Sequence, residues 1–185
     1  MFKIIALIGE SGTGKDSIMH AILTKQPGYF HEIISCTTRP MREGEQDGVN
    51  YYYLTQDEFI AKVNNKEMLE ATVFNNWCYG TSIDALDANK VNIGVFNPEG
   101  IRSIMKNPNI DIKVYKIVCS DKERLIRQLN REVNPNVEEI IRRFTTDKID
   151  FSSLPFQYTE IENQDSEDLE LAAHAILSQL ELTSD

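Results

Sequence analysis

The chain has 185 residues, of which 41% are hydrophobic, and its formal net charge is −10. This length fits a single domain with a normal core, whereas the acidic charge excludes a general nucleic-acid-binding protein, which needs a basic surface. Cys36, Cys78 and Cys119 are far apart, so they indicate neither a disulfide framework nor a zinc site and favour a reducing cytoplasm. The apolar run Phe2–Ile8 is too short to cross a bilayer, so we expect no membrane partner.

A strand, a glycine-rich loop and a helix are predicted in succession at the start of the chain. Phe2–Ile8 is apolar and rich in β-branched residues, as is typical of a central strand in a parallel sheet. The sequence GESGTGKDS follows at residues 9–17. Apolar residues then recur at helical spacing over 16–26, until Pro27-Gly28 ends the run. A phosphate-binding loop requires this order of elements.

Residues 35–82 interrupt the alternation of strands and helices. Aromatic and β-branched residues predict short strands at 31–37, 49–55 and 68–74. A capping box at Thr55 to Glu58 predicts the start of a helix, and residues 75–80 predict a hairpin turn. We therefore predict a small β-rich lobe inserted into the core.

The second half of the chain returns to alternating strands and helices. Further strands are predicted at 91–96, 111–119 and 156–163. Helices are predicted after the Asn97-Pro98 cap, after the Ser120–Glu123 capping box, and over 137–149 and 166–182. The alternation predicts an α/β fold of the P-loop NTPase type, with a mostly parallel sheet flanked by helices.

The loop after the first strand is a candidate site for a nucleotide triphosphate. Its glycines let backbone N–H groups approach the phosphates, and the helix dipole adds positive charge. Lys15 can reach the β- and γ-phosphates. A glycine-rich turn with an exposed lysine is the alternative, but the flanking strand and helix favour the phosphate loop. The candidate ATP-binding residues here are Gly9, Glu10, Ser11, Gly12, Thr13, Gly14, Lys15, Asp16 and Ser17.

The position after the lysine departs from the usual pattern, which has Ser or Thr there to hold Mg²⁺. This chain has Asp16, and the hydroxyl of Ser17 follows one residue later. A carboxylate beside a triphosphate is repulsive unless a cation lies between them, and carboxylates are natural Mg²⁺ ligands. We therefore expect Mg²⁺ with ATP, held by Asp16 or by Ser17.

A second anion site is indicated at residues 35–51. Arg39 and Arg42 are three residues apart, and hydroxyl groups lie close to them in the sequence. Two guanidinium groups with hydroxyls suit the oxygens of one phosphate monoester. Tyr51 can add a donor, and Glu45 can hold an arginine in position. A surface loop with scattered charge is the alternative, and spacing alone does not decide between them.

With this segment the sequence resembles the guanylate kinase family. The family pattern S-x-x-T-R-x-x-R-x-G-E-x-x-G-x-x-Y runs through Ser35, Thr38, Arg39, Arg42, Gly44, Glu45, Gly48 and Tyr51. The downstream stretch MLEATVFNNWCYGTS is similar to a second signature of the family, in which a glutamate precedes a tyrosine-glycine-hydroxyl turn. The resemblance is free of gaps from about Ile4 to Ser82 and can be followed to Asn163.

The resemblance implies a three-part enzyme. Its ATP-holding core would comprise residues 1–34, 83–122 and 150–185. The nucleoside-monophosphate (NMP) lobe would span about 35–82, and the helical lid about 123–149. Likeness to the family assigns the acceptor phosphate to Ser35, Arg39, Arg42, Tyr51 and Tyr79, and Asn97 also falls in the monophosphate site.

The same resemblance assigns the base to Glu70 and Thr81. Glu70 would accept hydrogen bonds from guanine N1–H and the exocyclic amine, and Thr81 would donate to O6. The chemistry agrees, because a carboxylate beside a hydroxyl complements the guanine edge, and a mismatched adenine would cost about 1 to 3 kcal/mol for each buried group left unpaired. The family has an aspartate where this chain has Asn97, so broader purine or deoxynucleotide use stays open.

Arginines in the second half would form the lid. Arg124, Arg127 and Arg131 lie on one helical face, and Arg142 and Arg143 lie on the next helix. A solvated basic face paired with neighbouring glutamates is the alternative for any one of them. The resemblance implies lid arginines at Arg131 and Arg143, which would stabilise charge on the moving phosphoryl group. It also implies an adenine contact from Asn163.

The expected function is ATP-dependent phosphorylation of GMP or dGMP by direct in-line transfer, with ATP and the monophosphate as the only partners of a cytoplasmic monomer or homodimer. The expected catalytic residues are Lys15, Arg39, Arg131 and Arg143. A kinase acting on several deoxynucleoside monophosphates is one alternative. A non-catalytic, protein-binding relative is another, although such relatives have usually lost the loop lysine.

Overall fold

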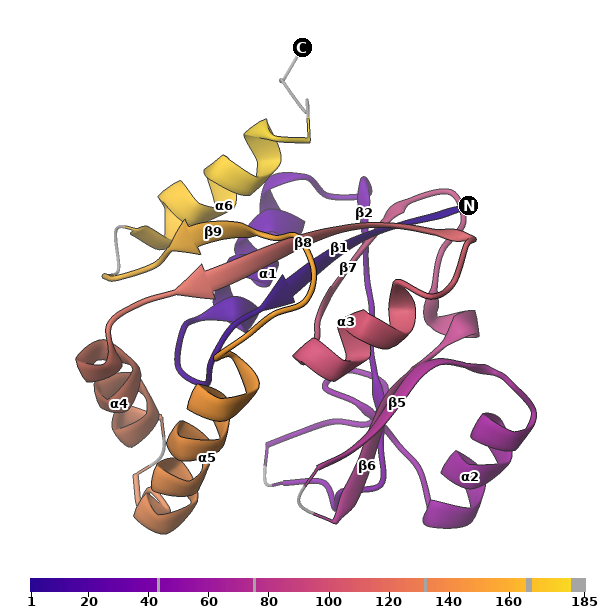
Figure 1. Ribbon diagram of the computed structural model, residues 1–185, viewed down its shortest axis with the longest axis horizontal. Helices are drawn as coiled ribbons and strands as arrows, with labels where there is room; N and C mark the ends of the chain where they lie inside the picture. Colours follow the sequence, from indigo (N-terminus) through magenta and orange to yellow (C-terminus); the bar gives the residue numbers. More distant parts are fainter. Residues whose placement is uncertain (43, 75, 132, 166–167, 181–185) are drawn as a thin grey trace. The chain divides into compact units, whose positions relative to one another are not determined.

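The computed structural model describes residues 1–42, 44–74, 76–131, 133–165 and 168–180 (Figure 1). Its strands are β1 (Phe2–Ile8), β2 (Phe30–Glu32), β3 (Cys36–Thr37), β4 (Tyr52–Tyr53), β5 (Met68–Phe74), β6 (Trp77–Ser82), β7 (Val91–Val95), β8 (Ile110–Val118) and β9 (Thr159–Glu162). Its helices are α1 (Lys15–Lys25), α2 (Gln56–Asn64), the 3₁₀ turn η1 (Ile83–Ala85), α3 (Pro98–Ile104), α4 (Asp121–Asn130), α5 (Val137–Asp150) and α6 (Asp168–Ser178).

The larger sheet has five strands in the order β2-β7-β1-β8-β9. Both edge pairs, β2 with β7 and β8 with β9, are parallel. Parallel strands need crossover connections, and helices supply them here, since α3 lies in the chain between β7 and β8. The predicted α/β class with a parallel sheet is confirmed.

The smaller sheet has four strands in the order β4-β3-β6-β5 and lies within the predicted β-rich segment. Strands β5 and β6 form an antiparallel hairpin, in which Glu70 is opposite Thr81. The helix α2 packs on this hairpin and begins at the predicted capping box, where Thr55 and Glu58 each bond the other's backbone N–H. The hairpin register therefore brings a carboxylate and a hydroxyl together.

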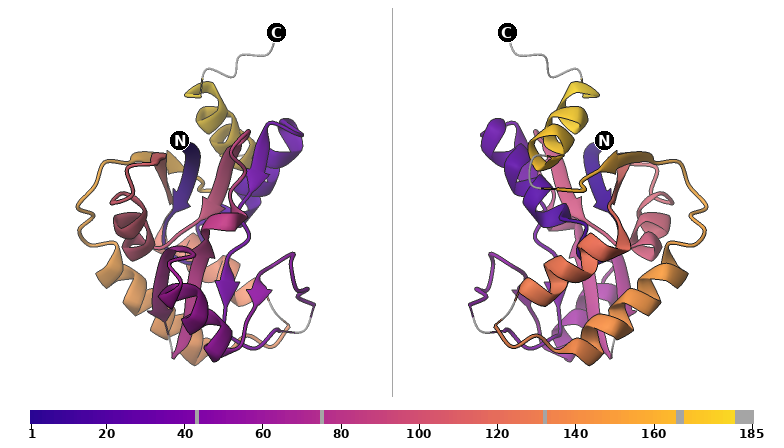
Figure 2. Two further views of the ribbon diagram at one scale, coloured as in Figure 1. Left: turned by 90° about the vertical axis from the view of Figure 1, so that its right-hand side faces the viewer. Right: turned by 90° about the vertical axis from the view of Figure 1, so that its left-hand side faces the viewer.

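The chain divides into two compact units. The first unit comprises Met1–Ile5 and Gly28–Ile112, and the second comprises Ala6–Pro27 and Lys113–Asp185. In the described part of the second unit, α1 packs against α6, and α6 packs against β9 (Figure 1). Helices α4 and α5 also pack side by side (Figure 2). The division into core, lobe and lid stays a prediction.

Apolar residues at regular spacing build the core of each unit. In the second unit, Ile18, Ile22 and Ile176 are fully buried where α1 meets α6. In the first unit, Ile101 and Ile104 of α3 are fully buried. Each such side chain contributes about 1.5 to 3 kcal/mol of transfer free energy, which holds the loops at the strand ends in place.

One predicted strand is wrong. The segment 31–37 forms two strands that belong to different sheets, because the chain leaves the larger sheet after Glu32 and joins the smaller one at Cys36. The isoleucines in between carry strand propensity, and propensity does not report such a change of sheet. The strand predicted at 49–55 shortens to β4, and the outermost four positions of the helix predicted at 166–182 lie outside the described residues.

Within the described ranges, every helix is too short or too polar to cross a lipid bilayer.

Candidate active site

The loop between β1 and α1 has the backbone of a phosphate-binding loop. Gly12 and Gly14 have positive φ angles of 85° and 88°, which side chains strongly disfavour. A Cβ at Gly12 would lie 2.6 Å from the carbonyl oxygen of Arg124, and a Cβ at Gly14 would collide with Nδ2 of Asn163. The glycines therefore allow both the turn of the loop and the close approach of Arg124 and Asn163.

Lys15 begins α1 and folds back over this loop. Its ammonium donates to the carbonyl oxygens of Gly9, at 2.8 Å, and of Glu10, at 3.1 Å. Burial lowers the pKa of Lys15, while the carboxylates of Asp16, Asp147 and Glu10 act in the opposite direction. The ammonium is thus held among the groups that would surround a phosphate.

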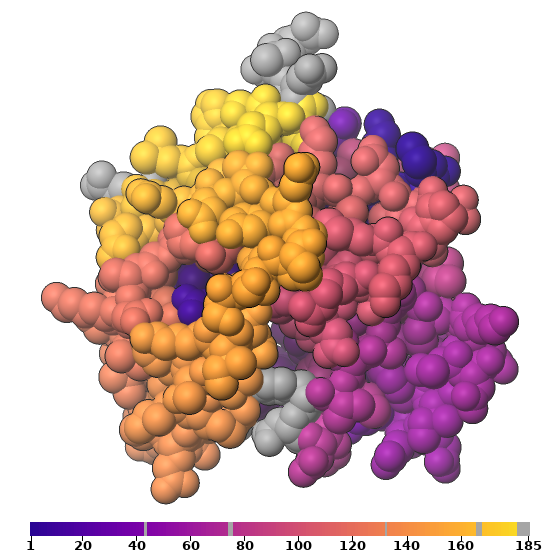
Figure 3. Space-filling model, in the orientation of Figure 1, coloured from indigo at the N-terminus to yellow at the C-terminus, as the bar shows by residue number. Residues whose placement is uncertain are grey.

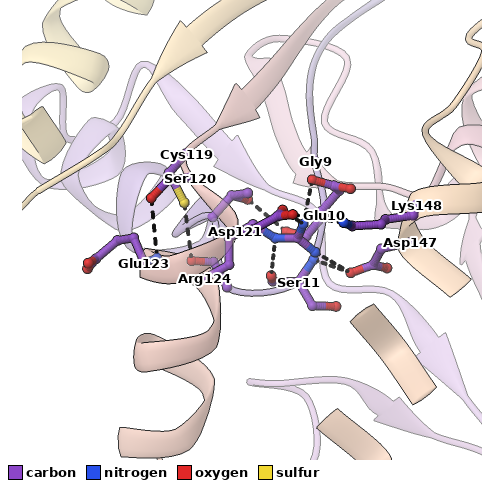
Figure 4. Close-up of polar contacts among 12 residues, drawn as sticks. Gly9, Glu10, Ser11, Cys119, Ser120, Asp121, Glu123, Arg124, Asp147 and Lys148 are labelled. Atoms are coloured by element: carbon purple, nitrogen blue, oxygen red, sulfur yellow. Dashed lines mark hydrogen bonds and ion pairs between the residues drawn. The ribbon is translucent and has the colours of Figure 1, made fainter. Parts of the chain in front are cut away.

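A buried arginine fixes the outer side of the loop (Figure 4). Arg124 is fully buried, and its guanidinium contacts three carboxylates: Glu10 at 2.7 Å, Asp121 at 3.1 Å and Asp147 at 3.2 Å. Its Nε donates to the carbonyl oxygen of Ser11 at 3.0 Å. Such a cation is tolerated in the interior only because it is paired and hydrogen-bonded.

Asp147, on α5, contacts the loop directly. The backbone N–H of Ser11 donates to its Oδ2 at 2.6 Å. In the space-filling view, indigo atoms from the start of the chain lie in a hollow bordered by the salmon and orange atoms of α4, α5 and the segment after α5 (Figure 3). Residues from the last third of the chain therefore border the phosphate loop.

Asn163, directly after β9, is almost fully buried and reaches the same loop. Its Nδ2 donates to the carbonyl oxygen of Thr13 at 2.7 Å. Its Oδ1 is buried and lacks a hydrogen-bond partner among the described residues. A buried acceptor without a donor is costly, so this atom marks a position where a ligand donor would be favourable.

Asp16 and Ser17 are both exposed in the first turn of α1. Among the described residues, no three His, Cys, Asp or Glu side chains are grouped to hold a metal ion. Mg²⁺ in nucleotide sites commonly takes only one or two carboxylates and completes its shell with water and substrate phosphates. An exposed carboxylate next to Lys15 fits that requirement.

In the first unit, a carboxylate clamps the first arginine of the second anion site. Arg39 pairs with Glu45 at 2.8 Å, and Glu45 also accepts from the backbone N–H of Arg42 and from the hydroxyl of Tyr53. Burial would raise the pKa of Glu45, but these hydrogen bonds outweigh it and lower the pKa to about 2. The expectation that Glu45 holds an arginine matches this geometry.

Three tyrosines surround this ion pair. The guanidinium carbon of Arg39 lies 5.6 Å from the ring centre of Tyr51 and 5.8 Å from that of Tyr53. Tyr51 also packs edge-on against Tyr79 at 6.1 Å. Cation–π contacts add to the hydrogen bonds in fixing the guanidinium, whereas the side chain of Arg42 is exposed.

Glu70 and Thr81 form the centre of the predicted base site. Glu70 is 9% exposed, and burial raises its pKa to about 7 against hydrogen bonds from the hydroxyl and backbone N–H of Thr81. The hydroxyl of Ser35 lies 3.2 Å from that of Thr81. Ser35 therefore lies beside Thr81, which is predicted to bind the base, and its assignment to the acceptor phosphate stays a prediction.

Asn97 caps α3 beside this carboxylate. Its Oδ1 accepts from the backbone N–H of Gly100 at 2.7 Å, and its Nδ2 donates to the hydroxyl of Thr72 at 3.2 Å. A Cβ added to Gly100 would lie 3.2 Å from both Asn97 Oδ1 and Glu70 Oε2. Asn97 thus caps the helix without adding a second negative charge next to Glu70.

The lid arginines differ in their surroundings. Arg131 follows α4 and is exposed, and Arg143 pairs with Glu139 at 2.7 Å. Hydrogen bonds from Arg142 and Arg143 lower the pKa of Glu139 to about 2, although partial burial opposes this shift. The alternative of a solvated face does not describe Arg124, which is fully buried.

Three contributors to these sites were not predicted from the sequence. Tyr53 is one, and the alternation of Tyr51 and Tyr53 along a strand places both on the same face, which was a usable signal. Asp147 and Thr72 gave no such signal. Asp147, for example, lies 136 residues from its partner Ser11. Each unit thus holds its own set: the first gathers the predicted monophosphate residues and the second the predicted ATP residues.

The sequence profile of the guanylate kinase family matches residues 1–180. The chain belongs to the guanylate kinase family. A guanylate kinase of Synechococcus elongatus is 37% identical over 145 residues, covering 76% of this chain and 78% of that protein. A guanylate kinase of Vibrio cholerae is 36% identical over 149 residues, covering 77% and 70%. The resemblance noted from the sequence motifs is confirmed, and the family is one of kinases.

A solved guanylate kinase structure shares the fold. The crystal structure of guanylate kinase from Anaplasma phagocytophilum superposes with a TM-score of 0.70 at 19% identity, covering 99% of this chain and 88% of that one. At this identity the likeness supports the fold alone.

Proposed function

We propose that this guanylate kinase family member transfers the γ-phosphoryl group of ATP to GMP or dGMP. The observation that carries the proposal is the pairing of buried Glu70 with Thr81 in the first unit. Ionised Glu70 accepts the two adjacent donors of guanine, N1–H and the exocyclic amine, which adenine cannot offer. In the same unit Arg39, clamped by Glu45, supplies charge for the acceptor phosphate.

ATP is bound by the second unit in this proposal. The N–H groups of the loop around Gly12 and Gly14 receive the phosphates, and the ammonium of Lys15 leaves the carbonyl oxygens of its own loop for them. The Oδ1 of Asn163, which lacks a partner among the residues that the structure describes, would accept a hydrogen bond from the adenine amine. Asp16, with Ser17 one residue on, would hold Mg²⁺, which neutralises charge on the β- and γ-phosphates.

The transfer is a single displacement. A phosphate oxygen of GMP attacks the γ-phosphorus of ATP, the bond from that phosphorus to the bridging oxygen breaks, and ADP leaves with the electron pair. No covalent intermediate on the enzyme is required. Arg131 and Arg143 of the lid would stabilise charge spread over the equatorial oxygens. The free thiols of Cys36, Cys78 and Cys119 agree with a reducing cytoplasm as the site of action.

A coupled assay of ADP release tests the proposal. Mg²⁺-ATP is offered with GMP, dGMP, AMP, CMP, UMP or dTMP, and we expect the highest kcat/KM with GMP or dGMP. Lys15→Ala is the inactive control, and Lys3→Ala, an exposed lysine on β1, is the matched variant that should keep full activity. Turnover of no monophosphate would overturn the catalytic assignment. A preference for AMP or dTMP would overturn the role of Glu70.

A further inference from the structure

We infer that Asp147 is an internal anion that occupies the phosphate loop when nucleotide is absent and thereby sets the affinity for ATP. The inference rests on the proposed ATP site and adds a residue to it. Asp147 lies on α5, far from the glycine-rich motif in the sequence, and no motif of the chain includes it. Its carboxylate nevertheless accepts a hydrogen bond from the backbone N–H of Ser11, in the middle of that loop.

The shortest contact of Asp147 is to the loop. Oδ2 lies 2.6 Å from the backbone nitrogen of Ser11 and 3.2 Å from the guanidinium of Arg124. Arg124 has two other carboxylate partners, Glu10 at 2.7 Å and Asp121 at 3.1 Å, so its charge is compensated without Asp147. Pairing of the buried arginine therefore does not account for the position of Asp147.

The surroundings of this carboxylate are those that a phosphate oxygen requires. A loop N–H points at it, a guanidinium lies beside it, and it is close enough to Lys15 to act on the pKa of the ammonium. A carboxylate and a phosphate oxygen compete for the same donors, because both are acceptors with negative charge. A triphosphate bound by the loop must then displace Asp147 or bear its repulsion, and either effect weakens binding.

Displacement is feasible because α5 buries few apolar side chains. Among its residues only Ile140 is buried, while Ile141 and Ile149 are 59% and 69% exposed. Segments with few buried apolar contacts open at low free-energy cost. The side chain of Asp147 is itself 17% exposed, so water can solvate it once nucleotide takes the loop.

Two substitutions and one matched control test the inference. Asp147→Asn keeps the size and removes the charge, and Asp147→Ala removes the acceptor as well. Glu138→Gln removes one exposed negative charge from the same helix, away from the loop. Calorimetry with Mg²⁺-ADP should show binding about tenfold tighter for both Asp147 variants, equivalent to about 1.4 kcal/mol. The Glu138 variant should stay within about twofold of the wild type.

Inorganic tripolyphosphate and adenosine separate the phosphates from the base. We expect tripolyphosphate to gain the same factor as ADP in Asp147→Asn, and adenosine to gain nothing. In the kinase assay KM for ATP should fall while kcat does not rise. The amide proton of Ser11, followed by NMR, should lose its downfield shift in Asp147→Ala, which removes the acceptor, and keep it in Glu138→Gln.

The outcomes are distinguishable. ADP affinity that is unchanged or weaker in both Asp147 variants, with wild-type binding intact, would overturn the inference and leave the proposed function standing. A chemical shift of the Ser11 amide proton that the Asp147 substitution leaves unchanged would also overturn the inference. Failure of the wild type to bind either ADP or tripolyphosphate would overturn both the inference and the proposed ATP site.

Discussion

The hydroxyl of Tyr53 donates to Oε2 of Glu45 at 2.7 Å, and this bond holds the carboxylate that clamps Arg39. Tyr53 thus acts through Glu45 on the arginine that is proposed to bind the acceptor phosphate. Its neighbour Tyr52 is 45% exposed. The two adjacent tyrosines of β4 therefore differ: Tyr53 bonds Glu45, whereas Tyr52 is exposed.

Removing the Tyr53 hydroxyl should weaken the binding of GMP and leave the binding of ATP unchanged. A hydrogen bond to a charged group is worth about 1.5 to 3 kcal/mol, but Glu45 keeps its bonds from Arg39 and Arg42, so we expect Tyr53→Phe to raise KM for GMP about five- to tenfold. KM for ATP should stay the same. Tyr52→Phe is the control and should change neither constant; equal effects of the two substitutions would refute the role given to Tyr53.

GMP binding should depend on pH through Glu70. Its pKa of about 7 means that the carboxyl group is largely protonated in mild acid, and a protonated acid accepts poorly from the guanine donors. We expect kcat/KM for GMP to fall as the pH drops below about 7, approaching tenfold per pH unit. Glu70→Gln should show only the titration of the GMP phosphate itself. A wild-type profile identical to that of the variant would exclude a titrating Glu70.

The raised pKa of Glu70 also makes the stability of the folded protein depend on pH, in a direction that can be predicted. The pKa of Glu70 rises from 4.5 to about 7 on folding, so its contribution favours folding below about pH 4.5 and is lost as the pH rises to about 7. The full shift corresponds to about 3 kcal/mol. Urea unfolding of Glu70→Gln should therefore show a gain over the wild type at about pH 8 that shrinks towards about pH 5. A gain that does not vary with pH would contradict this account.

Arg124 should be the most sensitive arginine of the lid region. Arg124→Met leaves Glu10 and Asp147 without their buried partner, and breaking such a pair costs about 3 to 5 kcal/mol. Arg127 is 25% exposed and pairs with Glu123, so Arg127→Met should cost less than about 1 kcal/mol. Denaturant midpoints at constant slope give both values. Similar losses for the two variants would show that burial of Arg124 is not the cause.

Gly14 should be required for ATP binding for a reason other than its positive φ angle. Gly14 and Gly28 share nearly the same positive φ, 88° and 87°, but only a Cβ at Gly14 meets another residue, Asn163. Both Ala variants should lose about 1 kcal/mol of stability from the backbone. Only Gly14→Ala should raise KM for ATP, by tenfold or more, because Asn163 must move. Unchanged KM in Gly14→Ala would argue against Asn163 as a nucleotide contact.

Local patterns predicted most of the fold, whereas the site residues that they indicated stay predictions. The apolar run of β1, the capping box at Thr55 and the Asn97-Pro98 cap are short-range signals, and each element lies where its signal placed it. The break between β2 and β3 was not predictable in this way, since a change of sheet is decided by pairing with β7 and β6. Asp147 was missed for the same reason: its role depends on a contact that spans most of the chain.

The groups that cover the phosphate loop reach it from far along the polypeptide. Ser11 is 113 residues from Arg124 and 136 from Asp147, and Thr13 is 150 residues from Asn163. During synthesis the loop leaves the ribosome long before these partners are made. A nascent chain can therefore form β1 and α1 early, but the contact of Asn163 with the loop forms only when β9 has emerged, so the surroundings of the loop are completed late in synthesis.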